Sequence, residues 1–293
     1  MRGSMFLIIS PALHNYSDDR IFRCLLVRCS LILSERAIDM SLGGFVLAIR
    51  SALVLLLMAA TVIPIAMVLV VASFIAPYRV TYFWIGRPWL KLAIAFTRHV
   101  GGVESRVSGY ENLLSAADGN RVIICSKHQS TYETFFFPSV MTNPVAYVYK
   151  KELRWVPFFG WAIGRLHMVP IDRSAKGDAW ARVATIGAKL MDQGKWIIMF
   201  PEGTRAARGD QLLYKTGAAR LALETGAVVV PVAAATGRCW PRKTMRFIPG
   251  SVDISIGPAI KPEEGEDAMA FMKRIETWIE TEMREIDSEA YVD

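Results

Sequence analysis

The chain has 293 residues, of which 53% are hydrophobic, and a formal net charge of +7. That length can build one sizeable domain plus an additional segment. The charge is uneven, because residues 40–103 contain five basic and no acidic residues, whereas residues 104–293 contain 24 basic and 23 acidic ones. A nucleic-acid-binding protein carries its positive charge on the folded domain, so no nucleic-acid partner is expected and anionic lipid is favoured.

Residues 1–39 are interpreted as a leader of mixed character. Their apolar run, residues 5–9, is short and no small-residue cleavage pattern follows it, so no signal peptide is predicted. One hypothesis is that the natural protein begins at Met40, which N-terminal sequencing of the native protein would test.

The cysteines show no C-x-x-C pairing and no histidine at metal-ligand spacing, so we predict reduced thiols, a cytoplasmic-facing protein and no metal site. They are Cys24, Cys29, Cys125 and Cys239.

Residues 40–100 are expected to form membrane-embedded or interfacial helices. No charged residue occurs across the 28 positions from Ser51 to Tyr78, a length that could cross a hydrocarbon layer of about 30 Å. Pro64 divides this segment. Basic residues on both flanks favour a hairpin that enters one leaflet, whereas the tolerance of membrane helices for proline allows one kinked spanning helix.

The segment that follows mixes aromatic and basic residues and predicts an interfacial amphipathic continuation. The residues concerned are Tyr82, Phe83, Trp84, Arg87, Trp89 and Lys91.

Residues 101–293 are predicted to form an α/β domain with a mostly parallel sheet flanked by helices, because short apolar strands alternate with helical patterns. The expected strands are 103–108, 121–125, 145–149, 167–171, 196–200, 227–232 and 252–256, and the expected helices are 131–141, 178–193, 216–224 and 266–288. The last helix is rich in acids, so one of its faces is expected to be solvated. Its other face is expected to pack on the domain through Met269, Met272, Ile275, Trp278 and Ile279.

A candidate ligand site follows the strand expected at residues 196–200, in the stretch Phe200–Arg205 with sequence FPEGTR. Polar groups at the carboxyl ends of strands in open α/β sheets lie where ligands bind. The planar fork of Arg205 suits an oxyanion such as a phosphate. A surface turn holding an ion pair is the simpler alternative.

A histidine five residues before a carboxylate could act as a base oriented by an acid. All four histidines have this spacing, in the pairs 14 and 19, 99 and 104, 128 and 133, and 167 and 172. Only His128 stands between a predicted strand and a predicted helix, so it shares the expected sheet edge with the FPEGTR stretch. A competing explanation is that Ser130-Thr131-Tyr132-Glu133 is a capping box, in which Glu133 bonds only backbone amides.

Together these stretches make the chain resemble the glycerolipid acyltransferase family, over roughly residues 104–260. Four blocks carry the resemblance in the family's order: Lys127–Ser130 through Glu133; Lys150–Leu153 with Val156–Trp161 and Ile171–Arg173; Phe200–Arg205; and Val229–Val232. One departure is Glu133, where the family usually has aspartate.

The resemblance implies roles for individual residues. His128 would be the general base and Glu133 would orient it, as the catalytic pair. The substrate-binding residues would be Lys127, Arg173, Glu202, Gly203, Thr204 and Arg205, with Arg205 on the acceptor's phosphate.

The resemblance also implies a reaction. A fatty acyl group would pass from an acyl thioester, of coenzyme A or acyl carrier protein, to the sn-2 hydroxyl of 1-acyl-glycerol-3-phosphate, giving phosphatidate. No bound cofactor is expected, and the active site would face the cytoplasm at a membrane. Another lysophospholipid or lipid acceptor, or a noncatalytic lipid-binding relative, is the alternative. A serine hydrolase is disfavoured because no Gly-x-Ser-x-Gly elbow occurs.

Overall fold

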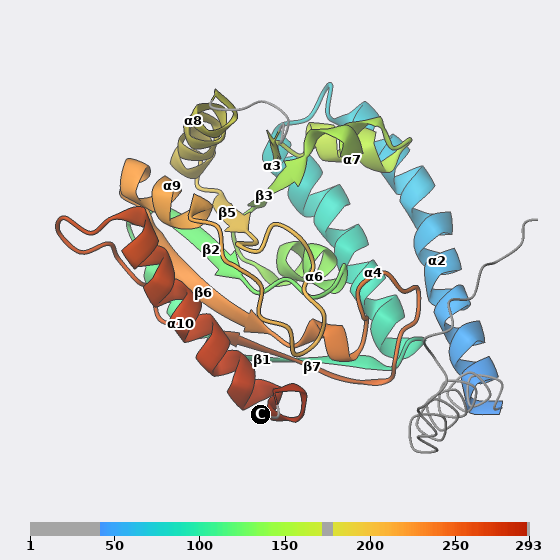
Figure 1. Cartoon of the computed structure of the whole chain (residues 1–293). Coiled ribbons are helices and arrows are strands. Elements are labelled where there is room, and N and C mark those ends of the chain that lie inside the picture. The colour runs from blue at the N-terminus through green and yellow to red at the C-terminus, as the bar shows by residue number, and fades with distance from the viewer. Residues whose placement is uncertain (1–41, 172–177, 292–293) are drawn as a thin grey trace, which may run out of the picture. The chain divides into compact units, whose positions relative to one another are not determined.

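The computed structural model describes residues 42–171 and 178–291, and its centre is a seven-stranded sheet (Figure 1). All seven predicted strands form, so the α/β prediction is confirmed. The strand order is β1-β7-β6-β2-β5-β3-β4. The strands are β1 (Val103–Ser108), β2 (Val122–Ser126), β3 (Val145–Lys150), β4 (Val169–Ile171), β5 (Trp196–Met199), β6 (Val228–Ala234) and β7 (Gly250–Ile256).

The sheet is mostly parallel. Every neighbouring pair is parallel except β6 and β7, so β1 and β7 run opposite to the other five strands. In the centre, β2 and β5 are neighbours, with Cys125 paired to Met199. The residues that follow these two strands therefore emerge side by side at one edge of the sheet, which is the edge where open α/β sheets bind ligands.

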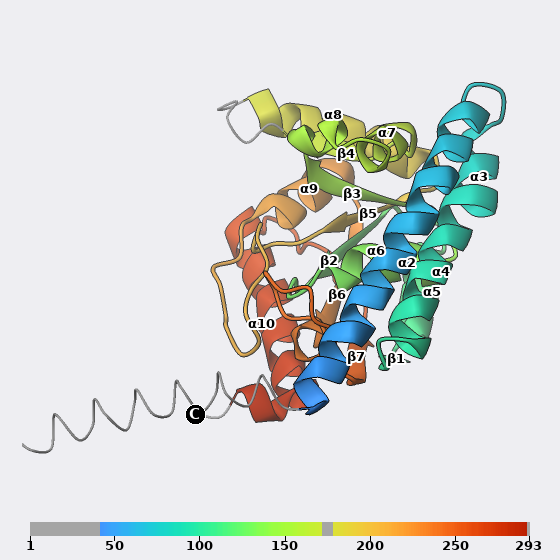
Figure 2. The same cartoon turned by 90° about the vertical axis from the view of Figure 1, so that its right-hand side faces the viewer.

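Helices cover both faces of the sheet (Figures 1 and 2). One face packs against α2 (Leu42–Ala72), α4 (Arg87–His99), α5 (Tyr110–Ala117) and α6 (Tyr132–Val140), and the other against α8 (Asp178–Asp192), α9 (Gly217–Thr225) and α10 (Ala268–Ile286). The remaining helices are α3 (Tyr78–Thr81), η1 (Tyr82–Gly86), η2 (Lys151–Trp155), α7 (Phe159–Arg165), η3 (Thr236–Arg238) and η4 (Ser288–Ala290). The sequence interpretation missed α5 and α7, which are short.

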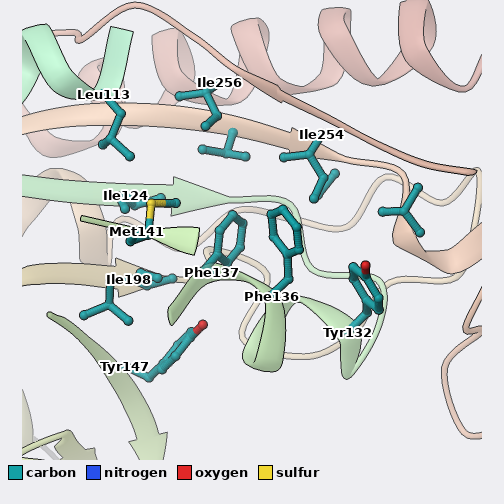
Figure 3. Packing of buried hydrophobic residues seen from close by; sticks show 14 of the residues in the cluster. Leu113, Ile124, Tyr132, Phe136, Phe137, Met141, Tyr147, Ile198, Ile254 and Ile256 are labelled. Atoms are coloured by element: carbon teal, nitrogen blue, oxygen red, sulfur yellow. The ribbon is translucent and has the colours of Figure 1, made fainter. Parts of the chain in front are cut away.

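The two cores divide by strand periodicity. In β2, Val122 and Ile124 point into the core under α5 and α6, while Ile123 and Cys125 point to α8–α10. Successive strand side chains face opposite sides, so a strand buried on both faces reads as a continuous apolar run. Figure 3 shows the first core, in which Phe136 and Phe137 of α6 lie among Ile124, Ile198 and their neighbours.

The apolar N-terminal segment is a single helix. Residues 42–72 run through Pro64 without a break, so the hairpin that turns at Pro64 is wrong. The chain turns instead after Ala72 and returns through α3, η1 and α4, where Trp89 Nε1 donates to Thr61 Oγ1 at 3.2 Å. Within the described residues, α2 is the one helix long and apolar enough to cross a membrane by length and composition, with a mean hydropathy of 2.9.

Two aromatic residues of the returning arm face the α/β domain. Tyr82 is 1% exposed, and its hydroxyl accepts a hydrogen bond from the backbone N–H of Val145. Trp89 is also buried, whereas Trp84 is 78% exposed. Tyr82 and Trp89 therefore join this arm to the α/β domain.

Helix α10 packs through the predicted face, with two differences. Met272, Ile275 and Ile279 are buried as expected, but Met269 is exposed. Glu280, predicted to be a solvated acid, is 3% exposed. A buried carboxylate needs a partner, and that partner lies in the candidate site.

Candidate active site

His128 lies just beyond the carboxyl end of β2 and is held from two sides. Its Nδ1 lies 3.0 Å from Glu133 Oε2, and its ring stacks on Phe200 with the ring centroids 3.9 Å apart. The His128 side chain is 15% exposed, so one edge of the ring reaches solvent. A carboxylate accepts only, so Nδ1 carries the donated proton and Nε2 of the neutral ring is left as the acceptor.

Glu133 is fully buried and bonds both backbone and side chains. Its Oε1 accepts the backbone N–H groups of Gln129 (2.9 Å) and Ser130 (3.0 Å), and also the hydroxyl of Thr236. Glu133 therefore makes the backbone contacts of a capping box and also the contact with the His128 ring, which the sequence left as alternatives. The backbone bonds fix Glu133 in place, which in turn fixes the His128 ring.

The described histidine pairs other than His128 and Glu133 do not form. Glu104 pairs with Arg98 at 3.4 Å, not with His99. His167 precedes β4, stacks on Tyr78 and lies 3.2 Å from Lys195 Nζ. Residues 14, 19 and 172 lie outside the described residues.

The FPEGTR stretch meets the histidine motif directly, as expected from the neighbouring strands β2 and β5. The backbone N–H of His128 donates to Glu202 Oε1 at 3.1 Å, and the N–H of Ala206 donates to the carbonyl of His128 at 2.7 Å. Arg205 Nη1 donates to Thr131 Oγ1 at 2.6 Å, so the guanidinium lies beside the start of α6. The two stretches therefore form one site.

Gly203 gives this loop its shape. Its φ of +68° lies in the left-handed region, and a Cβ at this position would come within 2.6 Å of Lys215 Nζ. A side chain there would therefore be strained by its own backbone and would displace the lysine. Next to it, Thr204 is exposed.

Glu202 is 4% exposed, and burial raises its pKa from 4.5 to about 7, against the opposing effect of the Lys127 charge. One oxygen, Oε2, is buried without a hydrogen-bond partner in the described structure. The side chain therefore acts inside the protein, on the backbone of His128.

Lys127 is not placed to bind a substrate, which corrects the expected role. Its side chain is fully buried, and its Nζ lies 2.6 Å from Glu280 Oε1 on α10. The sequence interpretation assigned Lys127 to the site because it adjoins His128, but its ammonium points to the opposite side of the loop.

The remaining basic residues differ in the partners that their side chains have within the protein. Arg173 lies outside the described residues. Arg238 pairs with Asp253 at 3.0 Å and with Asp287 at 2.7 Å, so its charge is used within the protein. Arg242 Nη1 donates to the carbonyl of Arg205 at 2.9 Å, which places a second guanidinium beside the FPEGTR stretch.

Two cavities lie away from this site. One, of about 420 Å³, is lined by Arg154, Gly160, Trp161, Arg165 and their neighbours; the other, of about 190 Å³, is lined by residues that include Tyr78 and His167. Neither contains a predicted site residue among the described residues that line it.

Sequence reasoning missed three contributors. Thr236 of η3 bonds Glu133, Glu280 of α10 pairs with Lys127, and Phe200 stacks on the His128 ring. Phe200 could have been noticed, because it ends the apolar run before the acid. No local pattern marks the other two.

Known proteins are similar to this chain in sequence and fold. The acyltransferase family profile matches residues 104–235. A 1-acyl-sn-glycerol-3-phosphate acyltransferase of Pseudomonas aeruginosa is 37% identical over 241 residues, which cover 82% of this chain and 92% of that protein. The human 1-acyl-sn-glycerol-3-phosphate acyltransferase alpha is 26% identical over 68% of this chain and 71% of its own.

A solved structure agrees at the level of the fold. The crystal structure of a 1-acyl-sn-glycerophosphate (LPA) acyltransferase from Thermotoga maritima superposes with a TM-score of 0.68 at 22% identity, covering 82% of this chain and 95% of that one. With this fold and with 37% identity to a relative along most of its length, the chain belongs to the acyltransferase family and is an enzyme of that family.

Proposed function

We propose that this enzyme transfers a fatty acyl group from a thioester to the sn-2 hydroxyl of 1-acyl-glycerol-3-phosphate, giving phosphatidate. The observation that carries the proposal is the pairing of His128 Nδ1 with the buried Glu133 carboxylate at 3.0 Å, directly beside the loop that presents Arg205. A base and an anion-binding group on two adjacent loops suit an acceptor that has a hydroxyl and a phosphate.

The chemistry needs one base. His128 Nε2 takes the proton from the acceptor hydroxyl as its oxygen attacks the thioester carbonyl, and the resulting imidazolium is stabilised by Glu133. Collapse of the tetrahedral intermediate breaks the carbon–sulfur bond. The thiolate that leaves receives the same proton from His128, so the enzyme returns to its starting state without a covalent intermediate.

Arg205 is the proposed contact for the acceptor's phosphate. Its guanidinium can bond two phosphate oxygens at once, and its bond to Thr131 orients it. Gly203 and Thr204 would contribute from the same turn, and Arg173 is retained as a second cationic contact. Glu202 acts through the loop backbone, not on the ligand.

The donor is proposed to be an acyl thioester of coenzyme A or acyl carrier protein. The enzyme would lie at the membrane, where the lysolipid and the product partition, because α2 presents exposed apolar side chains such as Leu56 and Val68. The active site would face the cytoplasm, consistent with the free thiols of Cys125 and Cys239.

The test is an acyl-transfer assay on membranes that contain the full chain, with a panel of lysolipid acceptors and both types of donor. Wild-type enzyme should convert lysophosphatidate fastest, and His128→Ala should remove nearly all of that activity. Near wild-type turnover by His128→Ala would contradict the proposed base. A preference for an uncharged acceptor would contradict the phosphate contact.

A further inference from the structure

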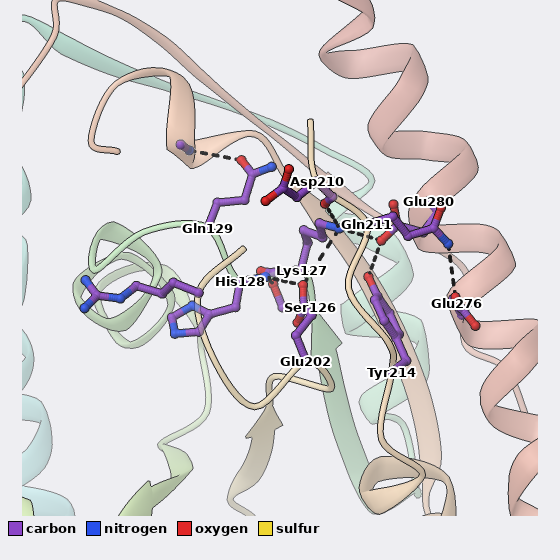
Figure 4. Close-up of polar contacts among 12 residues, drawn as sticks. Ser126, Lys127, His128, Gln129, Glu202, Asp210, Gln211, Tyr214, Glu276 and Glu280 are labelled. Carbon is purple, nitrogen blue, oxygen red and sulfur yellow. Dashed lines mark hydrogen bonds and ion pairs between the residues drawn. The ribbon is translucent and has the colours of Figure 1, made fainter. Parts of the chain in front are cut away.

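The ammonium group of Lys127 joins three parts of the protein inside the domain. Nζ lies 2.6 Å from Glu280 Oε1 on α10, donates to the carbonyl of Asp210 at 3.0 Å, and lies 3.9 Å from Glu202 Oε1. Figure 4 shows Lys127 between these groups, with His128 next to it along the chain. A buried charge survives only where partners of this kind compensate its lost hydration.

Glu280 is the closer of the two carboxylates to the Lys127 ammonium. The same Oε1 also accepts the hydroxyl of Tyr214 at 2.7 Å, so its position is fixed from a second side. Glu280 therefore holds the ammonium on the side of α10.

Because Glu280 holds the Lys127 ammonium, the Glu202 carboxylate remains bonded to the backbone of His128. Glu202 Oε1 accepts the His128 N–H at 3.1 Å, and the same loop continues to Arg205. Without Glu280, the Lys127 ammonium would attract the Glu202 carboxylate, which would turn toward Lys127 and away from the His128 N–H. The distance between Lys127 and Glu202 therefore affects where the loop holds His128.

We propose that Glu280 is a positioning residue for acyl transfer: by holding the Lys127 ammonium, it keeps the Glu202 carboxylate on the His128 backbone. The inference rests on the proposed function, because His128 must be the reacting base for its placement to matter. Helix α10 supplies none of the proposed substrate contacts, but through Glu280 it would help to position the base. Small displacements of a catalytic group cost large factors in rate, about 100-fold for 1 Å.

Helix α10 offers a matched control. Glu276 lies one turn before Glu280 and accepts a hydrogen bond from Gln211 at 3.1 Å. It therefore faces the loop that contains Asp210 and Gln211, without touching Lys127 (Figure 4). Comparing Glu280→Gln with Glu276→Gln separates the loss of the Lys127 contact from the loss of any acid on this face. Tyr214→Phe removes the hydroxyl bond to Glu280 and keeps its charge.

The experiment measures kcat and both KM values for the full chain in detergent micelles, with lysophosphatidate and an acyl thioester, alongside thermal unfolding. We expect Glu280→Gln to lower kcat per folded molecule by about tenfold or more, with the donor KM within about twofold of wild type. Glu276→Gln should keep kcat within about threefold. Tyr214→Phe removes one of the contacts that fix Glu280, so it should lower kcat, but less than Glu280→Gln does.

A Glu280→Gln enzyme that unfolds at a lower temperature but retains wild-type kcat would overturn the inference, because the residue would then be purely structural. If Glu280→Gln does not fold, Glu280→Asp is judged by the same criterion, since it keeps the charge but shortens its reach. Failure of the wild type to acylate lysophosphatidate would overturn the proposed function and this inference with it; an active wild type with unaffected Glu280 variants would overturn the inference alone.

Discussion

Glu202 Oε1 accepts the backbone N–H of His128 at 3.1 Å, so the loop after β5 holds the loop after β2. The contact exists because β2 and β5 are parallel neighbours whose last paired residues are Cys125 and Met199. Two stretches far apart in sequence thereby become one structural unit, and a change in either is expected to affect the other.

Arg205 and Arg208 provide the first prediction. Arg205→Ala should raise the acceptor KM about tenfold or more, since a hydrogen bond to a charged group contributes about 1.5–3 kcal/mol. The donor KM should not change. Arg208 pairs with the buried Asp287 at 2.7 Å, so Arg208→Ala should lower the melting temperature with a much smaller effect on the acceptor KM. Steady-state kinetics with varied lysophosphatidate check this, and an unchanged acceptor KM in Arg205→Ala would remove its phosphate role.

Glu133→Gln tests the two tasks of that carboxylate. The amide can still accept from the Ser130 N–H, but a second donor then faces His128 Nδ1, which disfavours the productive tautomer. We expect kcat to fall by about 100-fold or more, with only a small change in melting temperature. Glu111→Gln, an exposed acid in the first turn of α5, is the control for a general loss of charge at a helix start. A large stability loss with full activity per folded molecule would leave only the capping role.

Much of the fold could be predicted from local patterns. Runs such as Val122–Cys125 are of strand length and lack polar residues, which indicates a strand buried on both faces. In the structure, helices do cover both faces of the sheet. His128 and the FPEGTR stretch could be assigned to one edge because each follows a strand. Their contact required only that those strands be neighbours.

The supporting residues could not be predicted, because their partners come from distant parts of the chain. Lys127 and Glu280 are 153 positions apart. A lysine beside the proposed base is therefore interpreted as a substrate contact as long as the position of α10 is unknown. Acids on an amphipathic helix normally face water, which is why Glu280 was assigned to the solvated side. Pro64 allows either a hairpin or one continuous helix on sequence grounds, because an apolar helix can continue through proline.

Thr236 supplies a further prediction. Its hydroxyl donates to Glu133 Oε1, so Thr236→Val removes one donor from the buried carboxylate at nearly constant shape. We expect kcat to fall by about three- to tenfold, in line with about 1 kcal/mol for one hydrogen bond, with both KM values unchanged. Thr236→Ser should restore kcat, because the hydroxyl returns. A Ser variant as slow as the Val variant would show that packing, not the hydrogen bond, carries the effect.

The raised pKa of Glu202 predicts how stability depends on pH. Its pKa is about 7 in the folded protein and about 4.5 without burial, so between these values the folded state binds more protons than the unfolded state. Its contribution to stability is therefore present below pH 4.5 and lost as pH rises through 7. Glu202→Gln stays neutral, so its melting temperature relative to wild type should rise between pH 5 and pH 8. Glu264→Gln, an exposed acid, should show no such trend. Thermal unfolding of both variants across this range checks the prediction, and a difference for Glu202→Gln that does not change with pH would contradict it.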